Sequence, residues 1–132
     1  MEIYEEFARW LDALLENNDM PANTAAFNFN LYEEEDEAYG IQLIAADEFS
    51  DDDDDWACSE VWSSEEDVFY IDHSDEENAD AERGIEFIGG LIRDYLENGA
   101  MSTVLRKAEA VCCGFVDGAL TVIYKKDAGA EN

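Results

Sequence analysis

The sequence predicts an α+β fold in which a mostly antiparallel sheet of about five strands packs against helices on one face. Three observations predict it. Apolar residues recur at helical spacing near the start and again after residue 80, they alternate with polar residues between those segments, and an Asp-Gly pair separates two apolar runs near the end. The expected order of elements is α-β-β-β-(β)-α-α-β-β. With 132 residues, of which 47% are hydrophobic, we expect one acidic α+β domain covering residues 1–132.

The first segment has the pattern of an amphipathic helix. Its apolar residues recur every three or four positions: Ile3, Phe7, Trp10, Leu11, Leu14 and Leu15. Asn17-Asn18 followed by Pro21 ends that pattern. From residue 25 the period changes to two, and residues 27–31 and 39–43 each alternate apolar with polar side chains. This alternation predicts an antiparallel hairpin whose connection carries the acidic residues 33–37.

A third strand is predicted at residues 56–62, directly after a run of five aspartates. Alternation along that strand would place Trp56, Cys58, Glu60 and Trp62 on one face. The short run at residues 68–71 is either a fourth strand or an extended lead-in to the next helix.

A second amphipathic helix is predicted to end at Asn98-Gly99. Ser74-Asp75-Glu76-Glu77 fits the capping box that opens such a helix. Its expected buried stripe is Ile85, Ile88, Leu91, Ile92, Tyr95 and Leu96. Gly89-Gly90 costs about 1 kcal/mol per glycine relative to alanine, so we expect both positions to mark close packing on the sheet.

The last third of the chain predicts a short helical turn and a hairpin. The turn covers residues 103–107, and the hairpin joins residues 110–116 to residues 119–124. Asp117-Gly118 between them is typical of a type I′ turn, in which both central residues need positive φ.

The charge of the chain is strongly negative and unevenly distributed. The formal net charge is −28, and residues 1–99 hold 31 acidic side chains against three basic ones, whereas residues 100–132 hold four of each. Such a surface attracts cations over a Debye length of about 8 Å and repels nucleic acid and anionic lipid. We therefore expect a basic protein as the partner, with no direct binding to nucleic acid or membrane.

The cysteines and the start of the chain predict a cytoplasmic protein with free thiols. The three cysteines are an odd number, and Cys112 and Cys113 are adjacent in a predicted strand, so that their side chains point to opposite faces. The opening MEIYEEFARW lacks the pattern of a secretory signal, and no stretch approaches 18 consecutive apolar residues.

The acidic runs do not match a calcium-binding loop. With Asp51, Asp53 and Asp55 at positions 1, 3 and 5 of an EF-hand, glycine is needed at position 6 and glutamate at position 12. Trp56 and Trp62 occupy those places. We therefore expect no metal site in this run.

Catalytic patterns are also missing from the sequence. His73 is the only histidine, the cysteines lack CxxC spacing, and neither GxGxxG nor GxxxxGK[ST] occurs. We expect a noncatalytic protein with no cofactor.

The predicted binding surface combines three acidic connections that we expect to gather along one rim of the sheet. Trp56 or Trp62 would serve as an anchor there; the alternative, that both are core residues of a central strand, stays open. The predicted partner-binding residues are Glu33, Glu34, Glu35, Asp36, Glu37, Asp51, Asp52, Asp53, Asp54, Asp55, Trp56, Trp62, Glu65, Glu66 and Asp67.

Three segments also carry a family resemblance. They are the opening helix at residues 4–15, DDDDDWACSEVW at residues 51–62 and GFVDGALTVIY at residues 114–124. In a chain of this size they resemble the small acidic immunity proteins of bacterial polymorphic and contact-dependent growth-inhibition toxin systems. The resemblance implies a cytoplasmic, noncatalytic protein that blocks a basic toxin, often a nuclease, by covering its active site or substrate groove.

Two alternatives remain. The first is an acidic nucleic-acid mimic or a chaperone for a DNA-binding protein. The second is adaptation to high salt, against which the clustering of the charge upstream of residue 100 argues.

Overall fold

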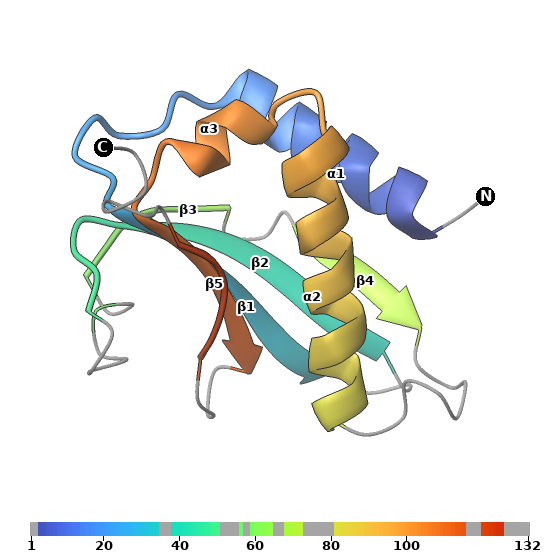
Figure 1. Ribbon diagram of the computed structural model, residues 1–132. Helices are drawn as coiled ribbons and strands as arrows, with labels where there is room; N and C mark the ends of the chain where they lie inside the picture. Colours follow the sequence, from blue (N-terminus) through green and yellow to red (C-terminus); the bar gives the residue numbers. More distant parts are fainter. Residues whose placement is uncertain are drawn as a thin grey trace.

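The computed structural model describes residues 3–34, 38–50, 56, 59–64, 68–72, 81–115 and 120–125. The elements follow the predicted order, and the α+β class is confirmed (Figure 1). They are α1 (Ile3–Asn17), β1 (Ala26–Glu34), β2 (Ala38–Ala46), β3 (Glu60–Ser63), β4 (Phe69–Asp72), α2 (Ala81–Asn98), α3 (Ser102–Arg106), β5 (Ala110–Phe115) and β6 (Thr121–Lys125).

The described strands form one six-stranded sheet in which β1 is central. The order is β3-β2-β1-β5-β6, with β4 also paired to β2. Strands β3 and β4 lie on the same edge of β2, where β3 pairs with residues 44–46 and β4 with residues 38–41. Four of the five pairings are antiparallel, whereas β1 and β5 are parallel. The sheet is therefore mixed, because the chain returns from β4 to the side of β1 through the helices α2 and α3.

The main core lies between the sheet and the three helices, which cover one of its faces (Figure 1). Phe27, Phe29 and Leu31 of β1 point into it and are at most 1% exposed. Phe7 of α1 is fully buried, and its ring lies 6.1 Å from the ring of Phe29. The helical periodicity of α1 and the alternation of β1 thus meet in one apolar layer.

A second, smaller core lies on the other face of the sheet. It consists of Ala26, Ala46, Trp56, Ala110 and Cys112, with Phe49 and Leu120 packed against it. The rings of Phe49 and Trp56 meet edge to face, 5.3 Å apart.

The predicted start of the third strand at Trp56 is wrong. Strand β3 begins at Glu60, which pairs with Ala46 next to an irregularity in the register. Trp56 lies outside the strand and is 3% exposed. The physical reason is the small size of Ala26, Ala46 and Ala110, which leaves room for the indole ring to bury its apolar surface on the sheet.

The predicted stripe of α2 is confirmed. Its residues are buried, except Ile85, which is half-buried. The capping box at Ser74-Asp75-Glu76-Glu77 and the turn at Asp117-Gly118 lie outside the described residues. No helix in the described ranges combines the length and the apolar character that crossing a bilayer requires.

The two glycines of α2 differ in their surroundings. A Cβ atom at Gly89 would lie 3.2 Å from Ile123 Cδ1 of β6, whereas a Cβ atom at Gly90 would meet nothing within 4 Å. The expectation of close packing is confirmed for Gly89 and wrong for Gly90.

This difference predicts the effect of alanine at each position. Gly90→Ala should raise the free energy of unfolding by about 1 kcal/mol, because alanine is the better helix former and the site is open. Gly89→Ala should gain less, because Ile123 must move. Urea denaturation of both variants measures the difference, and equal gains would contradict the close approach of α2 and β6.

Candidate functional site

Most of the predicted partner-binding residues lie outside the part of the chain that the structure describes. These are residues 35–37, 51–55 and 65–67. Glu33 and Glu34 end β1. Trp56 is buried in the small core. The alternative of two core tryptophans in a central strand is nevertheless wrong, because Trp56 lies outside the strand and β3 is at the edge of the sheet. Trp62 in β3 is half-buried and packs against the main core.

The strand ends that carry the acidic connections lie far apart. Glu34 pairs with Ala38 at one end of the β1–β2 hairpin, and Ala46 pairs with Glu60 at the other. A strand of this length spans about 26 Å at about 3.3 Å per residue. The third connection joins β3 to β4, and both of these strands pair with β2 on its outer edge. The expectation of a single rim is therefore wrong for the strand ends, because the register of β2 places them at two ends and one edge.

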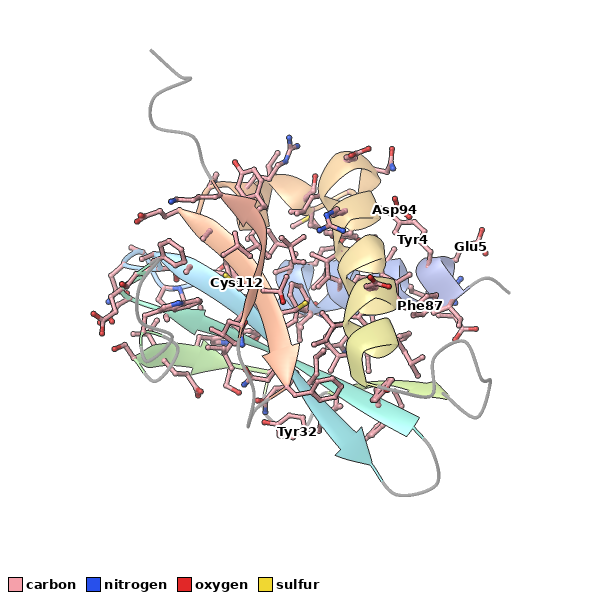
Figure 2. All side chains as sticks on the ribbon, turned by 60° about the horizontal axis from the view of Figure 1, so that its bottom comes forward. Tyr4, Glu5, Tyr32, Phe87, Asp94 and Cys112 are labelled. Atoms are coloured by element: carbon pink, nitrogen blue, oxygen red, sulfur yellow. The ribbon has the colours of Figure 1, made fainter. Side chains whose placement is uncertain are left out.

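The described residues instead form a groove between α1 and the end of α2, the α1–α2 groove. It encloses about 590 Å³ and is lined by Tyr4, Glu5, Ala8, Arg9, Asp12 and residues 98–100. Figure 2 shows Tyr4, Glu5 and Asp94 on the same side of the molecule. The C-terminus of a helix carries partial negative charge. The end of α2 and the carboxylates of Glu5 and Asp12 therefore line the groove together with one cation, Arg9.

A buried phenol fixes one of those carboxylates. Tyr95 is fully buried, and its hydroxyl donates to Asp12 Oδ1 at 2.5 Å and accepts from the Met101 N–H at 3.2 Å. Burial, followed by the hydrogen bond to Asp12, raises the pKa of Tyr95. A Cβ atom at Gly99 would overlap the Tyr95 ring. The contact thus joins α1, α2 and the start of α3 and holds Asp12 at the groove.

A second cavity lies between the end of α1 and α3, the α1–α3 cavity. It encloses about 540 Å³, and its apolar lining comes from Leu15, Met20, Phe27, Met101 and Val104. Charged side chains also line it: Glu16, Asp19 and Lys107.

The α1–α3 cavity lies at the same end of the sheet as Ala46 and Glu60, the strand ends on either side of residues 51–55. The Ala25 N–H donates to the Ala46 carbonyl, and the Glu109 N–H donates to the Ala25 carbonyl, both at 2.7 Å. Figure 1 shows the α1–β1 connection, α3 and β3 together at the left. This end of the sheet therefore brings together the α1–α3 cavity and the strand ends that flank one of the two five-residue acidic runs.

The helix-free face of the sheet carries a network of amide side chains. Asn28 Nδ2 donates to Asn30 Oδ1 at 2.5 Å, and both Asn30 Nδ2, at 3.2 Å, and the Tyr32 hydroxyl, at 3.1 Å, donate to Gln42 Oε1. Tyr32 lies near the far end of β1 in Figure 2. Asn28 is fully buried, and its Oδ1 is the buried side-chain acceptor without a hydrogen-bond partner in the described ranges. In the sequence, the residues of this network are the polar ones that alternate with apolar residues along β1 and β2. That alternation is the pattern that could have predicted a polar network on this face.

The two cysteines of β5 are buried and form no disulfide, as predicted, and they lie on opposite faces. Cys112 belongs to the small core and Cys113 to the main core. Cys58 and His73 lie outside the described residues. Across the described ranges, no three His, Cys, Asp or Glu side chains form a group that could hold a metal ion.

Comparison of the chain with protein-family models, with curated proteins and with solved structures finds no match. Its function must therefore be inferred from its own charge and surface.

The buried Cys113 thiol predicts a loss of stability at alkaline pH. Burial outweighs the opposing effect of Arg93 and raises the pKa of Cys113 from 9.0 to about 12. Above pH 9 the unfolded thiol ionises while the folded thiol keeps its proton. The free energy of unfolding should therefore fall as pH rises from 9 to 10, with a slope approaching about 1.4 kcal/mol per unit from this group.

Two alanine variants test this slope by urea denaturation. In Cys113→Ala, the free energy of unfolding should fall less steeply between pH 9 and 10, because the thiol is gone. Val111→Ala, on the same face of β5, should keep the slope of the unchanged chain. An unchanged slope in Cys113→Ala would show that another group causes the loss.

Proposed function

We propose that the protein is a noncatalytic immunity protein that neutralises a cognate basic toxin, such as a nuclease, by electrostatically steered binding. The observation that carries this proposal is the net charge of −28, concentrated upstream of residue 100. The resemblance of three segments to small acidic immunity proteins supports it. The first candidate partner is the product of the gene immediately upstream.

The fold supports this role by keeping the carboxylates on the outside of the helices. Glu5, Glu6 and Glu16 are exposed on α1, and Asp94 and Glu97 are exposed on α2. Their apolar neighbours face the main core, so the negative charge is displayed by rigid elements. Such a surface speeds encounter with a basic groove, and contacts formed afterwards slow release.

The surroundings of the described reactive groups support binding in preference to catalysis. Burial raises the pKa of the Cys113 thiol to about 12, whereas a nucleophilic thiol needs a lowered pKa and access to solvent. In the α1–α2 groove, burial and the charges of Asp94 and Asp12 raise the pKa of Tyr4. A groove lined by carboxylates and a protonated phenol is suited to a lysine or arginine side chain.

The end of the sheet near α3 is the part that we assign to the partner. Asp47, Glu48 and Glu109 are exposed there, next to the strand ends that flank residues 51–55. The opposite end of the hairpin carries the second acidic run, residues 33–37, and provides an internal control.

This assignment predicts different effects for two equal changes in charge. Replacing the five aspartates at residues 51–55 by asparagine should slow association with the cognate partner and flatten its salt dependence, because local charge steers encounter. Replacing the acids at residues 33–37 by their amides removes the same charge and should slow association less. Stopped-flow kinetics at several salt concentrations measures both effects, and circular dichroism checks the fold.

The outcome separates the proposal from its alternatives. Equal slowing by both variants would show that only total charge matters and would overturn the assigned end. Similar affinity for several unrelated DNA-binding proteins would favour nucleic-acid mimicry instead.

A further inference from the structure

We propose that the α1–α3 cavity receives an apolar side chain of the basic partner, a leucine, methionine or phenylalanine flanked by lysine or arginine. This inference rests on the proposed function and adds the chemistry of its anchor.

The cavity is shaped by helix packing that leaves a gap. Helix α3 packs on α2 and β5, whereas α1 packs on α2 and β4. The last turn of α1 and α3 therefore enclose the gap, with Phe27 of β1 in its lining. A volume of about 540 Å³ is in the usual range of small-ligand pockets, about 300 to 1,000 Å³.

The lining favours an apolar occupant with room to adapt. Met20 and Met101 lie in it together with Leu15 and Val104. Methionine side chains are flexible and polarisable, so they fit side chains of different shape. In protein interfaces, a few anchor residues seated in pockets supply most of the affinity, and these four side chains form the apolar part of the lining on which such an anchor would pack.

The charge around the cavity favours basic residues next to that anchor in the partner. Glu16 and Asp19 line it, and Asp47, Glu48 and Glu109 are exposed at the same end of the sheet. The described cations at this end are Lys107, which lines the cavity, Arg106, which is exposed beside it, and the exposed Lys125 of β6, which pairs with Ala110. The carboxylates outnumber the cations, so lysine or arginine next to the anchor is complementary to the rim.

Two capped synthetic peptides test the anchor directly. The first is Lys-Lys-Leu-Phe-Lys-Lys, and the second replaces its two central residues by serine. The chain should bind the first about tenfold more tightly than the second, because burial of one apolar side chain is worth at least that factor. Calorimetry measures both affinities.

Methionine methyl NMR locates the binding. Met20 and Met101 are two of the three methionines in the chain, and both line the cavity. Their methyl signals should shift with the leucine-phenylalanine peptide and stay in place with the serine peptide. This readout needs no variant, so it stands even if a substitution disturbs the fold.

A matched pair of tryptophan variants tests the cavity itself. Val104→Trp fills it and should abolish the preference between the two peptides while leaving the weaker binding of the serine peptide unchanged. Val122→Trp, at a residue on β6 that is 43% exposed, should keep the preference.

The outcomes separate this inference from the proposed function. Equal binding of the two peptides, or methyl signals that do not move, would overturn the anchor and leave the electrostatic proposal standing. Failure of both peptides to bind would overturn both.

Discussion

The central position of β1, hydrogen-bonded to β2 on one side and to β5 on the other, is the constraint on which the rest of the structure depends. Its odd positions from Phe27 to Leu31 bury the main core under the helices, and Ala26 begins the small core on the other face. Burial on both faces offsets the repulsion among the carboxylates of a chain with a net charge of −28. The charged side chains can therefore remain on the outside of a well-packed domain.

The sequence predicted the order of the elements because the periods of 3.6 and 2 are local properties. It missed the parallel pairing of β1 and β5, since periodicity assigns a residue to a face but says nothing about the neighbouring strand. It missed the departure of Trp56 from the strand, because the three alanines that receive the ring come from three different strands. The acidic runs were visible in the composition, whereas the α1–α3 cavity was not, because Leu15, Met20 and Val104 each resemble ordinary core or loop residues.

Charge and apolar surface have separate roles in the proposed interaction. The carboxylates act over about a Debye length and set the rate of encounter, whereas an apolar anchor acts only in contact and sets the lifetime of the complex. The end of the sheet near α3 combines both, because the α1–α3 cavity and the strand ends that flank residues 51–55 lie at that end, the cavity on the helix side of the sheet. The Tyr95 hydroxyl contributes by tying α1, α2 and the start of α3 together, so that the cavity walls are held in place.

Hydrogen–deuterium exchange of the chain, alone and with the upstream gene product, tests most directly which end of the molecule binds. We expect slower exchange in the complex at residues 16–25 and 102–109, around the α1–α3 cavity, together with the segment between β2 and β3. Residues 33–39, at the opposite end of the hairpin, should exchange as before. Protection confined to residues 33–39, or to the helix-free face of the sheet, would contradict the proposed binding surface.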